Sequence, residues 1–318
     1  MQDKYENQNS EPSDYIIGLR ELFDVLIHGK WIIASVTTLA SVAVILYSLS
    51  LPNIYQSKSL LFPVEASSGI SGALKSYSGL ASLAGVSLPS QVNESNSAKA
   101  MEKLKSLSFF EKNILPYIFL PELMAVKSWN PGINKIEFNE EVYNEVSNTW
   151  VLEPSSKKEI PSAQDSFAVF LSHLSISEDS QTGFVTLSVK HQSPFIAKKW
   201  ADLLISQINI FYRQKDKLEA EKSVNYLNTQ IAMTSFTEIK QVMAELLQQE
   251  TQKLTLIEAN ESYVFDYIDP PAVMEQKSEP KRSLIAILSV LLGGMLGIVI
   301  VLIKYYGMGK MPPKPSSL

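Results

Sequence analysis

The chain has 318 residues, a formal net charge of −5 and a pI near 5.4, and its lysines and arginines are scattered rather than clustered. Nucleic-acid binding needs a basic face that neutralises phosphates, so this charge pattern argues against a nucleic-acid partner. The absence of cysteine excludes disulfides, thiolate metal sites and cysteine nucleophiles.

The N-terminal region divides into two stretches of different character. Residues 1–14 are polar and acidic without periodicity, and they predict a disordered start. From Tyr15 to Lys30, apolar residues recur at helical spacing and predict a short amphipathic helix. Two placements stay open for this helix: it lies on a membrane surface, or it leads straight into the next segment as a plain extension.

The stretch from Trp31 to Leu51 is apolar, contains no charge and is long enough to cross a bilayer. Trp31 and Tyr47 stand where interfacial aromatic anchors are expected. A cleaved signal peptide is the competing interpretation. Because the leader before this stretch is long and acidic, the sequence favours an uncleaved membrane anchor.

A second uncharged apolar stretch runs from Ser283 to Ile303 and predicts another transmembrane helix. Gly293 and Gly297 stand four residues apart within it, with Gly294 beside the first. Small residues at this spacing let two helices approach closely in a bilayer, and they predict a helix contact. Glycine is also common in membrane helices without such a role.

The region between the two spans mixes strand and helix patterns, so we expect a small α/β domain near the membrane. Residues 66–90 are rich in Ser, Gly, Ala and Leu, and this composition predicts a mobile loop. A phosphate-binding loop is the alternative, but no Gly-rich sequence here continues into Lys-Ser/Thr. The expected strands are Asn53 to Phe62, His173 to Ser177 and Phe184 to His191, and the expected helices are 94–114, Glu141 to Trp150 and Gln164 to Leu171.

From Phe195 to Asp269 the chain contains neither glycine nor proline, and apolar residues step at three and four positions. This predicts one long helix, or two helices that meet near Met233-Thr234-Ser235. So long a helix cannot be buried in a small domain, so we expect it to protrude and pack against helices of other subunits. Ser262 to Asp269 then predicts a returning strand.

The sequence offers no catalytic or metal-binding constellation. His28, His173 and His191 lie in separate segments, and Glu219 and Glu221 fit a solvated helix face. Motifs for hydrolases, metalloproteases and nucleotide binding are missing. We therefore expect no cofactor, no metal and no enzymatic activity of the chain itself.

Four stretches of the sequence form a recognisable combination. They are the opening LRELFDVLIHGKWII, the strand NIYQSKSLLF that starts the base domain at Tyr55 and Leu60, SVKHQSPFIAKKWADLLISQIN, in which Pro194 opens the long helix, and EPKRSLIAILSVLLGGMLGIVIVLIKYY. Together they resemble the Wzz-type polysaccharide co-polymerases, the O-antigen chain-length determinants of Gram-negative inner membranes, and the last stretch is the strongest match. The matching family-motif and helix-packing positions are Pro270, Pro271, Pro280, Lys281, Arg282, Gly293, Gly294 and Gly297, although the connector holds fewer prolines than the commonest family form.

The resemblance implies an α+β membrane protein in which two transmembrane helices flank a periplasmic α/β base domain with a long protruding helix. It implies a homo-oligomeric ring in the bacterial inner membrane that sets the modal length of a lipid-linked glycan made by a Wzy-type polymerase. Membrane lipid, and the lipid-linked polysaccharide itself, are further expected partners. Related tyrosine kinases carry a nucleotide-binding domain after the second span, so the end of this chain at Leu318 predicts no such activity in cis.

Two spans place both termini on one side, and we expect that side to be the cytoplasm, although the lysine and arginine bias is weak. An export or adaptor protein for capsule or exopolysaccharide, working with a separate kinase, is the alternative. A sensory receptor would need a cytoplasmic output module that the short terminal segments do not supply. The expected segments are 1–30 cytoplasmic, 31–51 transmembrane, 52–193 periplasmic base, 194–261 long helical region, 262–282 returning strand and proline-containing connector, 283–303 transmembrane and 304–318 cytoplasmic tail.

Overall fold

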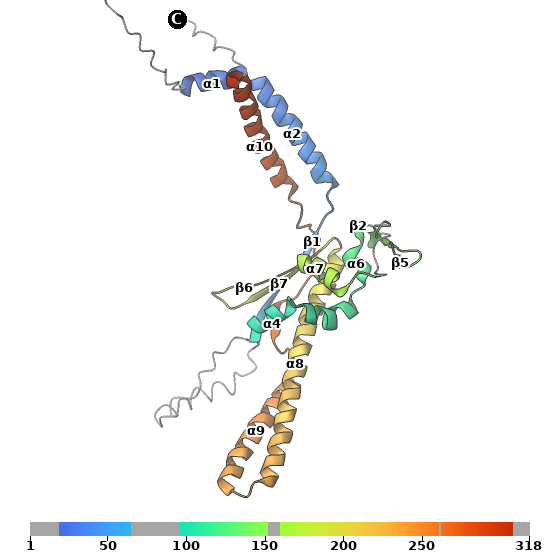
Figure 1. The fold of residues 1–318 in the computed structure, drawn as a ribbon, viewed down its shortest axis with the longest axis vertical. Helices are drawn as coiled ribbons and strands as arrows, with labels where there is room; N and C mark the ends of the chain where they lie inside the picture. Colours follow the sequence, from blue (N-terminus) through green and yellow to red (C-terminus); the bar gives the residue numbers. More distant parts are fainter. Residues whose placement is uncertain (1–18, 65–95, 152–159, 261, 308–318) are drawn as a thin grey trace, which may run out of the picture. The chain divides into compact units, whose positions relative to one another are not determined.

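The protein is described here by a computed structural model that covers residues 19–64, 96–151, 160–260 and 262–307. The chain divides into two compact units (Figure 1). One unit contains the residues up to Leu51 together with those from Pro280 onward, and the other runs from Pro52 to Glu279. The expectations for residues 1–14, the loop 66–90 and the tail beyond Gly307 lie outside the described residues.

The first unit consists of helices. The short helix α1 spans Leu19–His28, α2 spans Lys30–Ser50, and α10 spans Arg282–Leu302 before a π-helical turn at Ile303–Gly307. Helix α2, and α10 together with the π-helical turn, are long and apolar enough to cross a membrane. They coincide with the two apolar stretches in which the sequence predicts transmembrane helices.

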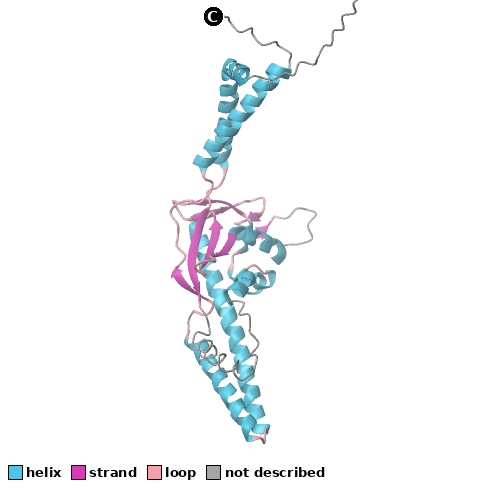
Figure 2. Ribbon diagram, turned by 90° about the vertical axis from the view of Figure 1, so that its left-hand side faces the viewer, coloured by secondary structure: helices cyan, strands magenta, loops and turns pink. Residues whose placement is uncertain are grey.

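The second unit is built on a four-stranded antiparallel sheet in the order β6-β7-β1-β8. Its strands are magenta in Figure 2. Its two central strands are far apart in sequence, and Ser59 of β1 lies opposite Leu187 of β7. All four strands fall within or next to stretches predicted to be extended. The strands are β1 Tyr55–Pro63, β6 Leu174–Glu178, β7 Val185–His191 and β8 Phe265–Asp269.

The first part of helix α8, which spans Pro194–Met233, packs on this sheet. Trp200 and Leu204 are fully buried with Leu187 of the sheet in one hydrophobic core. The buried Ser57 and Ser59 of β1 lie on this face of the sheet, and the exposed Lys58 between them lies on the other face. The remaining helices complete the core: α4 Asn96–Leu104, α5 Leu107–Phe109, η1 Phe110–Ile114, η2 Leu115–Tyr117, α6 Leu120–Met124 and α7 Ala163–His173.

Beyond the core, α8 continues into a helical hairpin. It ends at Met233, residues 234–236 are not helical, and α9 runs back over Thr237–Ala259 (Figures 1 and 2). The break lies where the sequence places the junction of its two-helix alternative. Lys217 of α8 forms an ion pair with Glu258 of α9, and Ile257 is buried between the helices and the base.

The predicted helix from Glu141 to Trp150 is wrong, because this stretch forms a β-hairpin. The hairpin consists of β4, Tyr143–Asn144, and β5, Thr149–Trp150. The side chain of Asn144 accepts hydrogen bonds from two amide groups of the turn, and Asn148 adopts a positive φ of 52°. Asparagine competes with helical hydrogen bonding in this way, so turn chemistry prevails over the weak helical pattern.

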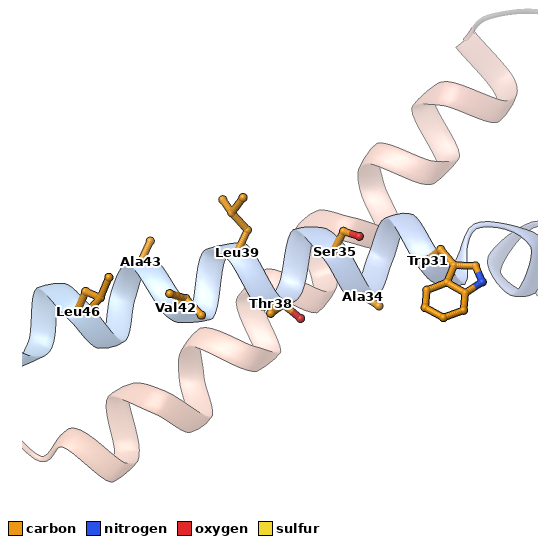
Figure 3. Close-up of a pocket in the computed structure, with 8 residues that line it drawn as sticks. All are labelled: Trp31, Ala34, Ser35, Thr38, Leu39, Val42, Ala43 and Leu46. Carbon is orange, nitrogen blue, oxygen red and sulfur yellow. The ribbon is translucent and has the colours of Figure 1, made fainter.

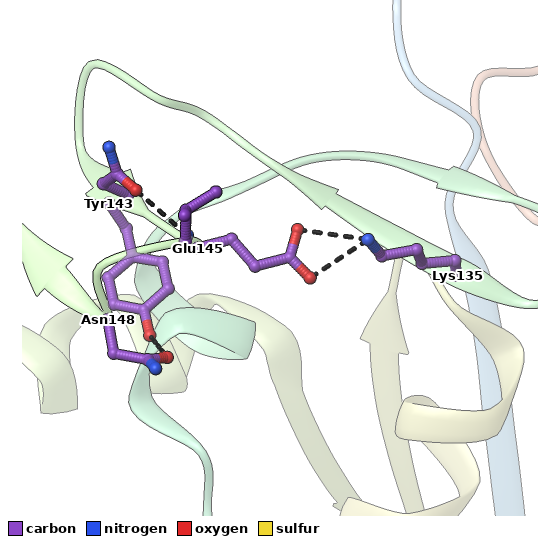
Figure 4. A network of polar contacts seen from close by, with 6 residues as sticks. Lys135, Tyr143, Glu145 and Asn148 are labelled. Atoms are coloured by element: carbon purple, nitrogen blue, oxygen red, sulfur yellow. Dashed lines mark hydrogen bonds and ion pairs between the residues drawn. The ribbon is translucent and has the colours of Figure 1, made fainter.

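A second hairpin occupies a region that the sequence left irregular. Strands β2, Val126–Asn130, and β3, Lys135–Phe138, pair on either side of Pro131-Gly132. Figure 4 shows how the two hairpins are joined, since Lys135 of β3 forms an ion pair with Glu145 at 3.1 Å. The same view shows the Tyr143 hydroxyl donating to the Asn148 side chain at 2.9 Å.

The predicted helix over 94–114 is interrupted. It forms as α4, α5 and the π-helical η1, with extended backbone at Ser106. The hydroxyl of Ser106 donates to the carbonyl of Lys103, which helps to end α4. The break still leaves the apolar residues Leu104, Phe110 and Ile114 buried in the core, as the helical spacing predicts.

Candidate functional site

The glycines singled out in the second apolar stretch lie against α2 of the same chain. Gly293 and Gly297 are buried, and α10 runs antiparallel to α2 at these positions. A Cβ atom at Gly297 would lie 2.9 Å from the Cα of Ile33, and one at Gly293 would lie 3.2 Å from the Cα of Thr37. At Gly297 the obstacle is a backbone atom at a distance that real Cβ atoms essentially never show, so this position requires glycine. At Gly293 a Cβ would require the two helices to shift by a few tenths of an ångström.

Gly294, the third glycine of the motif, points elsewhere. The nearest atom to a Cβ at this position is the Thr37 hydroxyl at 3.9 Å, an ordinary van der Waals distance. Gly293 and Gly297 therefore form the contact, whereas Gly294 stands beside it. The spacing of the glycines predicts a helix contact without naming its partner, and the structure places α2 of the same chain there.

Gly29 is a contact residue that sequence reasoning missed. It lies between α1 and α2, and a Cβ there would come within 2.5 Å of the Val301 side chain of α10. Its amide donates to the carbonyl of Val25, and its own carbonyl accepts from Ile33. Its position between an amphipathic helix and an apolar span was the available signal.

The opposite side of α2 carries a shallow groove (Figure 3). All of its lining residues come from the single helix α2, and they are apolar or small, with one tryptophan. A groove formed by one helix of this kind is surface that lipid chains cover. The lining residues are Trp31, Ala34, Ser35, Thr38, Leu39, Val42, Ala43 and Leu46.

At the other end of the helix pair, Arg282 begins α10. Its Nε atom donates to the carbonyl of Ser48 at 3.3 Å, which ties the start of α10 to the end of α2. Lys281, just before it, is exposed, and Pro280 is half-buried. A basic pair next to an apolar span is typical of the membrane–water boundary.

The connector that follows β8 is held along the start of β1 in the base unit. Pro270 is exposed and Pro271 is buried, and the carbonyl of Ala272 accepts from the Ser57 hydroxyl at 2.9 Å. Further on, the amide of Ile54 donates to the carbonyl of Glu279 at 3.0 Å. The connector is therefore fixed to the segment by which the chain enters this unit.

An ion pair strengthens this attachment. The ammonium of Lys190 on β7 lies 2.5 Å from a carboxylate oxygen of Glu279. Both side chains are partly exposed, so we expect a modest contribution to stability, up to about 1 kcal/mol. The pair fixes the end of the connector to a central strand of the sheet.

The residues expected at the entry of the base domain and at the start of the long helix have separate structural roles. Tyr55 opens β1 and packs edge-on against Trp129, with 5.3 Å between ring centroids. Leu60 is half-buried at the irregularity where β1 pairs with β8. Pro194 occupies the first turn of α8, where its missing amide hydrogen costs no hydrogen bond.

Asn209 is a second residue that sequence reasoning missed. From the middle of α8 its Oδ1 atom accepts from the amides of Val264 and Phe265, and its Nδ2 atom donates to the carbonyl of Phe265. One side chain thus holds the backbone at the start of β8. Nearby, the Tyr263 hydroxyl donates to Asp216 at 2.6 Å, and burial with this carboxylate raises the pKa of Tyr263.

His173 and His191 come together although the sequence places them in separate segments. Their ring centroids lie 6.0 Å apart, and both rings pack against Trp200. His191 is buried, its Nδ1 atom accepts from the amide of Ser193, and its Nε2 atom lies 2.9 Å from the carbonyl of Glu122. Burial lowers the pKa of His191 to about 4 and also lowers the pKa of His173.

The buried His191 predicts a base unit that loses stability in acid. His191 binds a proton near pH 6.5 in the unfolded chain and only near pH 4 in the folded chain. As the pH is lowered from 6.5 to 4, the free energy of unfolding should therefore fall, by roughly 3 kcal/mol. Burial raises the pKa of Glu122, which acts in the opposite direction and reduces the total. Unfolding of the full chain in detergent, followed by circular dichroism across this range, measures the change.

His191→Gln should reduce that pH dependence, because this ring no longer titrates, whereas His173, whose pKa burial also lowers, still acts in the same direction. His28→Gln is the matched control, since His28 is exposed at the end of α1. An unchanged pH profile in the His191 variant would show that another group controls the acid sensitivity.

The described ranges contain no group of three His, Asp or Glu side chains that could hold a metal ion. The arrangement is instead one of attachment: paired membrane helices, a connector fixed to a sheet, and a helical hairpin fixed by Asn209 to the strand that leads into the connector. Such an arrangement suits a structural scaffold, in which each element is held in a fixed position by its neighbour.

Comparison with known proteins gives two family matches. Residues 16–114 match the family model "Wzz: Chain length determinant protein", and residues 235–306 match "GNVR: G-rich domain on putative tyrosine kinase". The first match includes α1, α2 and β1, and the second includes α9, the connector and α10. No curated protein matches the chain.

Two solved structures are similar to the chain. A full-length bacterial polysaccharide co-polymerase shares 13% identity at a TM-score of 0.39, over 94% of this chain and 100% of that one. A fragment of WzzB, a polysaccharide co-polymerase from Salmonella Typhimurium, shares 12% identity at a TM-score of 0.30, over 71% of this chain and 100% of the fragment.

Proposed function

Because residues 16–114 match the chain length determinant model, we propose that the chain is a Wzz-type chain length determinant and sets the modal length of a lipid-linked surface polysaccharide. The observation that carries the proposal is the Wzz match over the first membrane helix and the first strand of the base unit. In this proposal the polysaccharide is lipopolysaccharide O-antigen, and a Wzy-type polymerase performs the chemistry. The chain itself is a regulator and catalyses nothing.

We place the protein in the bacterial inner membrane with the base unit in the periplasm and both termini in the cytoplasm. Two membrane helices that flank one unit require the termini to share a side, and long loops are exported largely regardless of their charge. The proposed domains keep the boundaries that the sequence suggests, with the α8–α9 hairpin as the protruding region.

The regulator works as a homo-oligomer, arranged as a ring. Support comes from α9, whose side away from α8 exposes Ile239, Val242 and Leu246 at helical spacing. An isolated helical hairpin has no other described element to cover this stripe. Helices of neighbouring copies, packed as in a coiled coil, would bury it.

Deleting the gene in its host and separating the extracted lipopolysaccharide on a gel tests the function. We expect the modal cluster of bands to collapse into a random ladder biased toward short chains, and the wild-type gene to restore the cluster. An unchanged ladder would contradict O-antigen control and would direct the same strains to capsule and exopolysaccharide assays.

A second candidate function is an adaptor for capsule or exopolysaccharide export, working with a separate kinase. The GNVR match over residues 235–306 favours it, because that model describes a domain found on tyrosine kinases. Loss of capsule without a change in O-antigen length, together with a kinase gene beside this one, would support the adaptor and exclude the first proposal.

A further inference from the structure

Helix α1 turns away from α2 at Gly29 instead of extending it (Figure 1). Gly29 has φ −85° and ψ 2°, which ends one helix and begins the other. Because the tip of α10 approaches Gly29 so closely at Val301, a side chain at this position would collide with it. The turn is therefore fixed by contacts within the helical unit.

The two faces of α1 differ sharply. Phe23 and Ile27 are 65% and 56% exposed, whereas Val25 is 3% exposed and packs toward the helix pair. Asp24 and His28, four residues apart on the polar side, are also exposed, and the His28 ring bonds to the carbonyl of Asp24 at 2.8 Å. The outward apolar face is left uncovered by the described part of the chain.

The position of α1 identifies what covers that face. The helix ends directly before Lys30 and Trp31, where the apolar span begins, and Trp31 is 75% exposed. A charged residue and a tryptophan at this point mark the membrane–water boundary. The exposed side chains of α1 thus continue the lipid-facing surface of α2 at the depth of the headgroups.

We propose that α1 lies in the plane of the membrane, with Phe23 and Ile27 among the acyl chains and Asp24 and His28 toward water, and that it thereby braces the end of α10 through Gly29 and Val301. The helix carries one arginine and one histidine against two acidic residues and so has no excess of positive charge; apolar burial drives the contact, and anionic lipid is not needed. The sequence left open whether this helix lies on the membrane surface or extends the span, and the turn at Gly29 favours the membrane surface.

The absence of cysteine from the chain allows a direct test. Single variants Phe23→Cys, Ile27→Cys, Asp24→Cys and His28→Cys of the full chain are spin-labelled and reconstituted in vesicles of phosphatidylcholine alone. Collision with oxygen, which concentrates in the bilayer, and with a water-soluble nickel chelate is then measured at each label. We expect the oxygen-to-nickel ratio to be several-fold higher at positions 23 and 27 than at 24 and 28.

Equal ratios at the four positions would overturn the proposal, as would labels at 23 and 27 that neither reagent reaches, because a second copy of the chain would then cover the face. A ratio that rises only when anionic lipid is added would overturn the apolar mechanism. Since the readout is depth in a bilayer, it is independent of any effect on polysaccharide length, and the proposed function can fail or hold separately.

Discussion

Gly297→Leu is expected to separate α10 from α2 and to abolish the modal polysaccharide length. The new Cβ would lie 2.9 Å from the Cα of Ile33, and backbone of a paired helix cannot move aside as a flexible side chain can. Overpacking of this kind costs about 1–3 kcal/mol or more. In a bilayer, where close packing rather than hydrophobic exclusion holds helices together, that cost is enough to disrupt the pair.

The cysteine-free chain again provides the measurement. A Cβ at Gly293 would lie 3.3 Å from the Cβ of Ala40, and the shift of a few tenths of an ångström that a Cβ requires there brings the two atoms to the separation found in disulfides. Ala40→Cys with Gly293→Cys should therefore form a disulfide across the helix pair. Disulfide yield and the lipopolysaccharide ladder are then compared with and without Gly297→Leu. We expect both the yield and the modal band cluster to be lost in the presence of the leucine.

Gly294→Leu is the matched control, since it adds the same side chain one helical step away, where the nearest atom is 3.9 Å distant. It should keep the disulfide and the modal cluster. Equal damage from both variants would point to a general effect of leucine in the span, and no damage from Gly297→Leu would refute the contact as a functional element.

The sequence predicts well the elements whose hydrophobic pattern extends over many residues. The apolar stretches behind α2 and α10, and the alternation behind β1 and β7, are signals that local context rarely overrides. It failed where short side chains bond to the backbone. Asn144 and Asn148 turn an apparent helix into a hairpin, and Ser106 interrupts another.

The sequence predicted which residues of the candidate site matter, but not which residues they contact. The spacing of Gly293 and Gly297 indicated a contact, but no one-dimensional pattern could assign it to Ile33 and Thr37. Gly29 was missed because its constraint comes from Val301, more than 200 residues away in sequence. Contacts of this kind depend on tertiary structure, so spacing alone cannot reveal them.

The same limit explains Asn209 and the histidine pair. An asparagine within a helix pattern gives no sign of a special role in the sequence. The role of Asn209 depends on the contact between α8 and β8, which only the fold creates. His173 and His191 meet because α7 and β7 both pack on Trp200. The sequence predicted ordinary histidines in separate segments, and the shared burial that lowers their pKa values follows from the fold.

Leu204→Ala should destabilise the base unit strongly. Leu204 is fully buried where α8 crosses the sheet, and truncating a buried leucine costs about 2–5 kcal/mol through lost contacts and the cavity left behind. Chemical unfolding of the full chain in detergent, followed by circular dichroism, should show the midpoint moving to lower denaturant concentration. Because α8 also forms the hairpin, the modal polysaccharide length should be lost with it.

Leu218→Ala separates core packing from the general effect of shortening a leucine in α8. Leu218 lies in the same helix but is 53% exposed, so its truncation should change the free energy of unfolding by no more than about 0.5 kcal/mol. A large loss in both variants would mean that the stability of α8 depends on helix propensity along its length. A large loss in Leu204→Ala alone would show that the stability comes from the packing of α8 on the sheet. The orientation of the α8–α9 hairpin would then be set by that packing.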